Sequence, residues 1–194
     1  MSIIFATNNK NKVQEIQTML PNFDLLTLKS INCTEDIPET QPTIAGNAKQ
    51  KANYVTQNYQ VACFADDTGL EIEALNGEPG VFSARYAGTN NNADDNMNLV
   101  LEKLKHHKNK NARFVTVIAL NLNGKQHTFE GICKGSIISE KRGEKGFGYD
   151  PIFIPEGFNK TFAEMTSAEK ASVSHRGKAV KLLVAFLNSE AIAK

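Results

Sequence analysis

The chain has 194 residues and a formal net charge of +1 at pH 7, with 41% hydrophobic and 22% charged residues. This balance is typical of a globular protein with one sizeable core. It excludes a global electric field that would recruit nucleic acid or an anionic membrane, so any anion site must come from local clusters of lysine and arginine. The three cysteines are widely spaced and form no C-x-x-C pair, which predicts reduced thiols and argues against a disulfide framework or a zinc site.

The ends and the interior of the sequence carry no sign of export or membrane insertion. The N-terminal apolar run turns polar at Thr7, which is too early for a signal peptide. No apolar run approaches the roughly 20 residues that a membrane span needs. We therefore expect a soluble, cytoplasmic protein, and the absence of repeats or linkers predicts a single domain over residues 1–194.

The first element is a short buried strand at residues 2–6, followed by the polar segment 7–12 and a helix that ends at Pro21. A strand that leads through a polar turn into a helix N-terminus is a recurrent phosphate-binding arrangement, because free N–H groups and the helix dipole favour an anion. A solvated turn with an asparagine cap is the alternative interpretation.

A second strand is predicted at residues 23–31 and a helix at 43–59. Between them lies a rigid acidic loop, residues 36–42, in which Glu39 stands between two prolines. Lys51 flanks the apolar stripe of the helix, and a lysine in such a place is usually solvated.

The most informative stretch is residues 61–73. An apolar run to Ala65 predicts a buried strand, and it ends on the adjacent carboxylates Asp66 and Asp67 before a predicted Thr-Gly turn. If strand geometry persists, the two carboxylates face opposite ways, because side chains alternate along a strand. Carboxylates at the end of a buried strand are costly unless they meet a metal, a cation or backbone donors. An ordinary Asp-rich turn is the alternative.

The following region contains a helical turn at residues 83–86, an amphipathic helix at 94–104, and two β-rich runs at 114–122 and 127–138. Asn123-Gly124 joins these two runs and is a strong hairpin signal. Together with the strand–helix–strand beginning, this predicts an α/β fold with a mixed sheet.

Residues 147–153 form an aromatic turn between glycines that opens another strand. Such an aromatic residue is either a packing plug or a ring face offered to a flat ligand.

A capping box at residues 166–169 begins a short helix that carries Lys170. The C-terminal helix then opens at 174–178, with Leu182 among its inward-facing residues. Its first turn holds His175 and Arg176, although cations there oppose the helix dipole. Either the cost is tolerated, or these side chains are held to meet an acceptor.

Taken in order, five of these motifs resemble the inosine/xanthosine triphosphate pyrophosphatase family, and the likeness runs from residue 3 to about residue 187. The motifs are Thr7–Lys12 (TNNKNK), Asp66–Leu70 (DDTGL), Gly80–Gly88 (GVFSARYAG), Gly146–Phe153 (GFGYDPIF) and Ser174–Arg176 (SHR). The resemblance implies Mg²⁺-dependent hydrolysis of ITP, dITP and XTP to the monophosphate and pyrophosphate. It also implies an elongated mixed sheet with flanking helices forming two lobes around a central cleft, and a homodimer.

The resemblance also implies a set of site residues. Asp67 is then the catalytic carboxylate, Glu39 and Asp67 lie near the metal, and Thr68 contacts the substrate. The other substrate-binding positions are Thr7, Asn8, Asn9, Lys10, Asn11, Lys12 and Lys51 for the phosphates, and Phe147, Gly148, Tyr149, Asp150, Lys170, His175 and Arg176 for the base and sugar.

Two positions depart from the family's pattern. Asn8 stands where the family commonly has glycine, and asparagine tolerates a positive φ. Gly46 precedes Asn47 where the family commonly has glutamate, so this helical turn lacks the carboxylate that the family commonly has there. The role of Asp66, as a second metal ligand or as a structural brace, stays open.

The sequence leaves three alternative functions. The first is a catalytically silent nucleotide-binding regulatory module of the same fold. The second is a nucleic-acid-binding protein, which the neutral charge and the lack of a basic stripe disfavour. The third is the related group of pyrophosphatases that act on modified pyrimidines, in which the His175–Arg176 pair is less expected. The sequence does not rank ITP, XTP and their deoxy forms.

Overall fold

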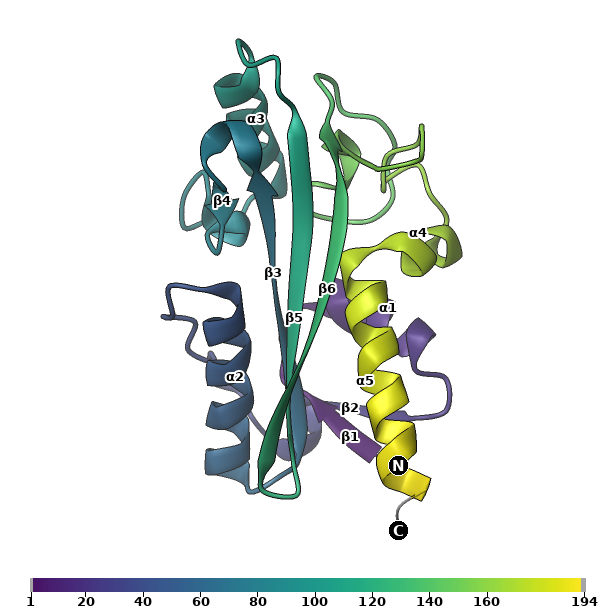
Figure 1. Cartoon of the computed structure of the whole chain (residues 1–194). Helices are drawn as coiled ribbons and strands as arrows, with labels where there is room; N and C mark the ends of the chain where they lie inside the picture. The colour runs from purple at the N-terminus through teal and green to yellow at the C-terminus, as the bar shows by residue number, and fades with distance from the viewer. Residues whose placement is uncertain (1, 193–194) are drawn as a thin grey trace. The chain divides into compact units, whose positions relative to one another are not determined.

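The structure is a computed structural model of the chain that describes residues 2–192. Its strands are β1 (Ser2–Phe5), β2 (Asp24–Thr27), β3 (Cys63–Ile72), β4 (Pro79–Gly80), β5 (Asn111–Leu122), β6 (Lys125–Ile137) and β7 (Phe153–Pro155) (Figure 1). Its α-helices are α1 (Lys10–Met19), α2 (Ile44–Tyr59), α3 (Ala93–Leu104), α4 (Ser167–Val173) and α5 (His175–Ile192). None of the helices in this range has both the length and the apolar character that crossing a membrane requires.

The strands in the described part of the chain form a mixed sheet in the order β2-β1-β3-β5-β6-β7, with β4 paired to β3. β1 runs parallel to both of its neighbours, with Ser2 opposite Asp24 and Ile4 opposite Cys63. β4 and β7 are antiparallel to their partners. The predicted α/β class with a mixed sheet is therefore confirmed.

The described residues divide into two compact units, each assembled from separate segments of the chain. Unit 1 holds the residues up to Asp67, Thr116–Gly131 and the segment from Gly177 onward; unit 2 holds Thr68–Val115 and Ile132–Arg176. The division falls within β3, β5 and β6, so each of these strands contributes residues to both units. Neither unit is a continuous stretch of sequence.

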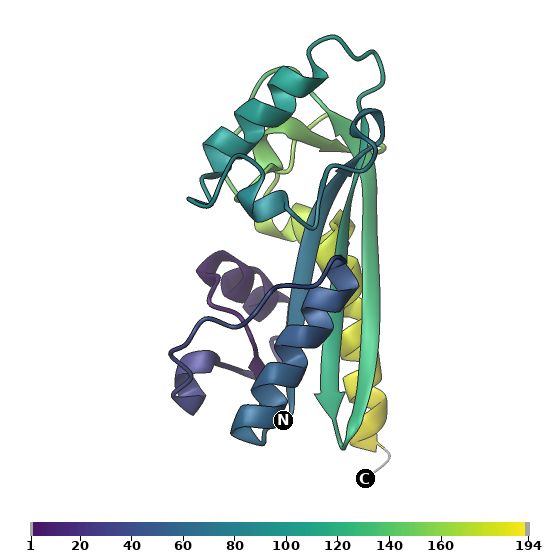
Figure 2. The ribbon, with the colours of Figure 1, turned by 90° about the vertical axis from the view of Figure 1, so that its left-hand side faces the viewer.

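In unit 1, helices cover both faces of the strands: α2 lies on one side, and α1 and α5 lie on the other (Figures 1 and 2). Phe5 of β1 stacks on Phe64 of β3 with ring centroids 4.7 Å apart. Ile16 of α1 and Leu183 of α5 are completely buried in the same cluster. Full burial of such a side chain contributes about 1.5–3 kcal/mol, so this cluster is a main source of unit 1's stability.

In unit 2, α3 packs its apolar side against the strands. Val100 and Leu104 of α3 are buried in one cluster with Phe114 of β5 and Phe153 of β7. The two phenylalanine rings meet edge to face, with centroids 4.8 Å apart. The amphipathic helix predicted for this region is confirmed.

The predicted turn after Asp67 is wrong, because β3 runs without interruption from Cys63 to Ile72. Leu70 pairs with Gly80 of β4, and the Leu70 N–H donates to Ser83 Oγ at 2.8 Å. These partners satisfy the backbone in an extended conformation, and they override the turn preference of the Asp-Asp-Thr-Gly sequence.

Two smaller predictions are also wrong. The second strand ends at Thr27 instead of residue 31, because Leu28–Ile31 form a 3₁₀ turn in which Ser30 Oγ accepts from the Thr27 N–H at 3.3 Å. Leu182, predicted to face inward from α5, is 50% exposed. The hairpin at Asn123-Gly124 is confirmed, with both residues in the left-handed region, at φ 52° and 73°.

Gly135 of β6 offers a direct test of the packing in unit 2. A Cβ at this position would lie 2.2 Å from the Ile154 carbonyl oxygen and 2.6 Å from Phe153 Cζ. Gly135→Ala should therefore lower the free energy of unfolding by about 1–3 kcal/mol. The neighbouring Ser136→Ala should change it by at most about 0.5 kcal/mol. Urea denaturation of both variants measures the difference, and equal stability would contradict this packing.

Candidate functional site

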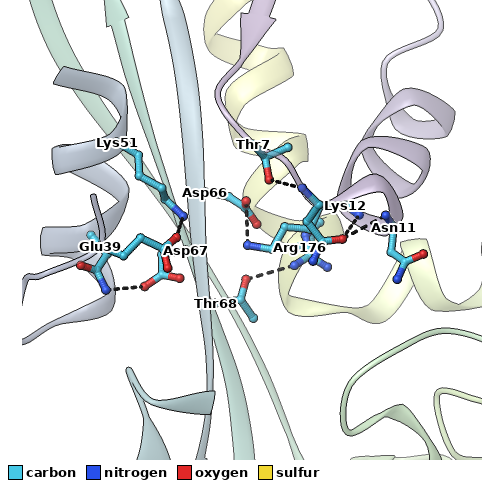
Figure 3. Close-up of polar contacts among 11 residues, drawn as sticks. Thr7, Asn11, Lys12, Glu39, Lys51, Asp66, Asp67, Thr68 and Arg176 are labelled. Carbon is cyan, nitrogen blue, oxygen red and sulfur yellow. Dashed lines mark hydrogen bonds and ion pairs between the residues drawn. The ribbon is translucent and has the colours of Figure 1, made fainter. Parts of the chain in front are cut away.

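The segment between β1 and α1 caps the helix. Asn9 Oδ1 accepts from the N–H groups of Asn11 and Lys12 at 3.0 and 3.2 Å, and Thr7 Oγ1 accepts from the Asn9 N–H at 3.1 Å (Figure 3). The asparagine cap that the sequence left open is therefore present. The backbone of Asn8 lies outside the left-handed region, so the turn needs no glycine there. An anion at this helix end would have to exchange with the Asn9 carboxamide or use the exposed side chains around it.

Asp66 and Lys12 form a buried ion pair. Lys12 Nζ lies 3.0 Å from Asp66 Oδ1, and the Asp66 side chain is completely buried while that of Lys12 is 13% exposed (Figure 3). A carboxylate without solvent is costly unless a cation neutralises it. The pair therefore holds the Lys12 ammonium at the end of α1, and it supports the role of a structural brace for Asp66.

Asp67 faces the opposite way, toward α2. Asn47 Nδ2 donates to Asp67 Oδ2 at 3.3 Å, and Asp67 is only 9% exposed. The predicted alternation of the two carboxylates is therefore confirmed. Burial raises the pKa of Asp67, although Lys51 and Lys12 oppose this rise. A carboxylate with a raised pKa is a stronger base than an ordinary aspartate.

Lys51 and Glu39 complete this acidic and basic cluster. Lys51 of α2 forms an ion pair with Glu39 from the acidic loop, and it is only 5% exposed (Figure 3). Burial lowers the pKa of Lys51, but the carboxylates of Asp67, Asp66 and Glu39 together raise it above its ordinary value. The expectation of a solvated lysine is therefore wrong, and Lys51 is a fixed positive charge within unit 1.

The carboxylates Asp67 and Glu39 offer a metal only oxygen ligands. Among residues 2–192, no group of three or more His, Cys, Asp or Glu side chains is placed to hold a metal by itself. Mg²⁺ often takes one or two protein carboxylates and completes its shell with water and substrate phosphates. These ligands therefore fit a Mg²⁺ ion that binds together with a phosphate ligand better than a Mg²⁺ ion that is held by protein side chains alone.

In unit 2, Arg176 is held by Thr68. Arg176 is 2% exposed and its Nη2 donates to Thr68 Oγ1 at 3.1 Å (Figure 3). His175 is 3% exposed, and its ring stacks on Phe114 with centroids 4.5 Å apart. Of the two explanations for cations in the first turn of α5, the contact with Thr68 supports the one in which the Arg176 side chain meets an acceptor.

The aromatic turn at Phe147 carries a second buried ion pair. Lys170 Nζ lies 2.6 Å from Asp150 Oδ2, which also accepts from the Phe147 N–H at 2.8 Å. Lys170 and Arg176 both lie over the Phe147 ring, at 5.0 and 5.5 Å from its centroid. Gly146 is required because its φ is 75° and a Cβ would lie 2.0 Å from Asp150 Oδ2. The turn thus holds an aromatic ring among cations, which agrees with the interpretation of a ring face offered to a flat ligand.

Comparison with known proteins assigns the chain to a family. The Ham1 family model matches residues 3–186. The chain belongs to the Ham1 family. The dITP/XTP pyrophosphatase of Flavobacterium johnsoniae is 60% identical over 190 residues, which cover 97% of this chain and 99% of the relative. The dITP/XTP pyrophosphatase of Porphyromonas gingivalis is 52% identical and covers 95% of this chain and 96% of its own.

Solved Ham1 structures share the fold. The Staphylococcus aureus Ham1 protein superposes with a TM-score of 0.89 at 37% identity, covering 98% of this chain and all of its own. A HAM1 protein from Coxiella burnetii gives the same TM-score and identity, over 97% of this chain and 99% of its own.

The structure of this Ham1 chain gathers the predicted side chains in each unit. In unit 1 they are Lys12, Glu39, Lys51, Asp66 and Asp67; in unit 2 they are Thr68, Phe147, Asp150, Lys170, His175 and Arg176. Tyr149 differs, because its ring is 5% exposed and its hydroxyl donates to the Ser83 carbonyl at 2.8 Å. Only the backbone of Tyr149 is then available to a ligand. Arg85 lies over the Phe82 ring, with its Cζ 5.3 Å from the ring centroid.

Sequence reasoning missed Asn47, which is 1% exposed and contacts Asp67 directly. A signal was available, because Asn47, Lys51 and Val55 are spaced four residues apart along α2 and so share one face. Two polar residues on an otherwise apolar stripe indicate a buried polar site.

The Lys12–Asp66 ion pair predicts a large effect on stability. Lys12→Met keeps the length of the side chain but leaves Asp66 as a buried charge without this cation, so the free energy of unfolding at pH 7 should fall by about 3 kcal/mol. Lys10→Met, which changes an exposed lysine two positions away, should alter it by at most about 0.5 kcal/mol. Urea denaturation compares the two variants, and a Lys12→Met protein as stable as Lys10→Met would show that the pair does not brace the site.

Proposed function

We propose that this chain is a Mg²⁺-dependent nucleoside-triphosphate pyrophosphatase that hydrolyses dITP, ITP and XTP to the monophosphate and pyrophosphate. The observation that carries the proposal is Asp67, a buried carboxylate with a raised pKa that stands among Lys51, Lys12 and Glu39. It is supported by relatives up to 60% identical over nearly the whole chain that are named dITP/XTP pyrophosphatase. Nothing favours a catalytically silent regulatory module.

In this proposal, unit 1 binds the triphosphate. A triphosphate carries about four negative charges, which need concentrated cations and N–H donors. Lys12 and Lys51 are fixed by ion pairs, while Lys10 is exposed at the start of α1. With the side chains and backbone of residues 7–11, these lysines bind the phosphates and stabilise the charge on the departing pyrophosphate.

Asp67 and Glu39 would hold the Mg²⁺ ion. When bound, Mg²⁺ polarises a phosphoryl oxygen and lowers the pKa of a water molecule. Asp67 orients a water molecule for attack on the α-phosphorus and accepts its proton. The bond between the α-phosphorus and the bridging oxygen then breaks, and the electron pair leaves with pyrophosphate. Asp66, paired with Lys12, acts on this step only through the lysine.

Unit 2 would select the base and bind the sugar. Hypoxanthine and xanthine carry a 6-oxo acceptor where adenine carries a 6-amino donor. Donors from Arg176, His175 or nearby backbone pair with the oxo group, and adenine leaves them mismatched. Phe147 stacks on the base, while Gly148, Tyr149, Asp150 and Lys170 complete the pocket and Thr68 contacts the substrate. Guanine, which also has a 6-oxo group, is refused at its 2-amino group.

We further propose that all 194 residues act as one catalytic domain, because each compact unit is built from interleaved segments of the chain. The enzyme works in the cytoplasm, where nucleotides are free and its three buried cysteines, none of which forms a disulfide, stay reduced. It forms a homodimer, as the family resemblance suggests, and needs no nucleic acid or membrane partner.

Asp67→Asn tests the catalytic assignment. The substitution keeps the size of the side chain but removes the base, so kcat with ITP and Mg²⁺ should fall about 10²- to 10⁴-fold while ITP still binds. Asp95→Asn, an exposed aspartate on α3, should leave kcat within about twofold. Pyrophosphate release gives kcat, and calorimetry gives binding. Near-normal turnover by Asp67→Asn would remove this residue from its role.

Arg176→Ala tests the selection of the base. Loss of the guanidinium removes a donor to the 6-oxo group, so the ratio of kcat/KM for ITP over ATP should fall at least about tenfold. Arg113→Ala, which changes an exposed arginine in unit 2, should keep the ratio. Because Arg176 is buried, Arg176→Lys provides a second variant that retains the positive charge. An unchanged ratio in folded protein would place the discrimination elsewhere.

A further inference from the structure

Asn47 lies in the first turn of α2 and has two partners on different segments of unit 1. Its Nδ2 donates to Asp67 Oδ2 at 3.3 Å, and its Oδ1 accepts from the Gln41 N–H at 2.9 Å. The residue is 1% exposed; its bond to Asp67 is buried, and its bond to the Gln41 N–H is partly buried. A buried carboxamide with separate donor and acceptor partners has one orientation that satisfies both of them.

Gln41 belongs to the loop that carries Glu39, and this loop has no regular secondary structure of its own. It closes tightly on α2, because a Cβ at Gly46 would lie 2.7 Å from Gln41 Cβ and 2.9 Å from Thr43 Oγ1. Glycine at position 46 therefore permits the close contact. This contact explains why Gly46 stands where the family commonly has glutamate, because a larger residue would not fit unless the loop moved.

Two neighbouring turns of α2 hold the two carboxylates. Asn47 contacts Asp67, and Lys51, four residues later on the same face of the helix, pairs with Glu39. Asn47 also fixes the Gln41 backbone, two residues after Glu39. The carboxylates come from a strand and from a loop, so their relative position depends on these side chains of α2.

We propose that Asn47 is a positioning residue that sets Asp67 against the loop bearing Glu39, so that both carboxylates are in place before a metal and a nucleotide bind. The inference rests on the proposed function, because Asp67 and Glu39 are the carboxylates assigned there to catalysis and to Mg²⁺. Groups that orient metal ligands without touching the metal commonly change affinity or activity by 10- to 100-fold when they are removed.

Gln50 provides a matched control. It also joins α2 to the loop: the Thr40 N–H donates to Gln50 Oε1, and Gln50 Nε2 donates to Thr40 Oγ1, both at 2.9 Å. It is half-buried, and both of these bonds stay within the helix and the loop. Gln50→Ala therefore removes one attachment of the loop but leaves the Asn47–Gln41 and Lys51–Glu39 contacts and Asp67 in place, whereas Asn47→Ala removes the contacts with both the loop and Asp67.

The experiment compares Asn47→Ala and Gln50→Ala in the full chain by kcat and KM for ITP and by calorimetry with Mg²⁺ alone. Asn47→Ala should lower kcat about 10- to 100-fold and weaken Mg²⁺ binding about tenfold, while Gln50→Ala stays within about twofold of the wild type. Asn47→Asp retains an acceptor for the Gln41 N–H and loses the donor to Asp67. It should keep the loop as resistant to proteolysis as in the wild type and still lose turnover.

Several results would overturn the inference. One is a folded Asn47→Ala protein with wild-type kcat and wild-type Mg²⁺ affinity. Another is a Gln50→Ala protein that loses as much kcat and Mg²⁺ affinity as Asn47→Ala does. If Asn47→Ala does not fold, Asn47→Ser, which adds no charge beside Asp67, decides by the same readouts. A wild-type protein that releases no pyrophosphate from ITP would refute the proposed function instead, and the Mg²⁺ isotherms of the variants would still decide the role of Asn47.

Discussion

The site depends on the burial of two carboxylates, Asp66 and Asp67, which are consecutive residues of strand β3. Asp66 and Asp67 follow each other in β3, so their side chains leave the strand on opposite faces. Asp66 meets the ammonium of Lys12, and Asp67 meets the carboxamide of Asn47. Burying two charges without partners would cost several kcal/mol per ion. Because Lys12 belongs to α1 and Asn47 to α2, the contacts that offset this cost also fix these two helices against β3.

Cations in each unit are held by acids of the same unit, although the overall charge is only +1. In unit 1, Lys12 and Lys51 are paired with Asp66 and Glu39; in unit 2, Lys170 is paired with Asp150. Each ion pair restricts the conformations of the lysine side chain and so fixes the position of its positive charge. The fixed lysines of unit 1 suit a polyanionic ligand, and the aromatic ring of Phe147 in unit 2 suits a flat one.

Much of this was predictable from local patterns. The alternation of Asp66 and Asp67, the Asn123-Gly124 hairpin and the capping box at Thr166 each follow from a few neighbouring residues, and each is confirmed. The continuity of β3 was not predictable, because it depends on the distant partner Ser83. The burial of Lys51 likewise depends on carboxylates from two other segments, Asp66 and Asp67 of β3 and Glu39 of the acidic loop. Local sequence gives the residue types, but only the fold gives their partners.

The most direct test of the account is pyrophosphate release by the wild-type chain over ITP, dITP, XTP, GTP and ATP, with Mg²⁺ and with the metal removed. If the proposed donors match a 6-oxo group, kcat/KM for ITP, dITP and XTP should exceed that for ATP by about 100-fold or more. The account also predicts that removing Mg²⁺ abolishes release. Equal rates over all five nucleotides, or no release from any of them, would contradict it.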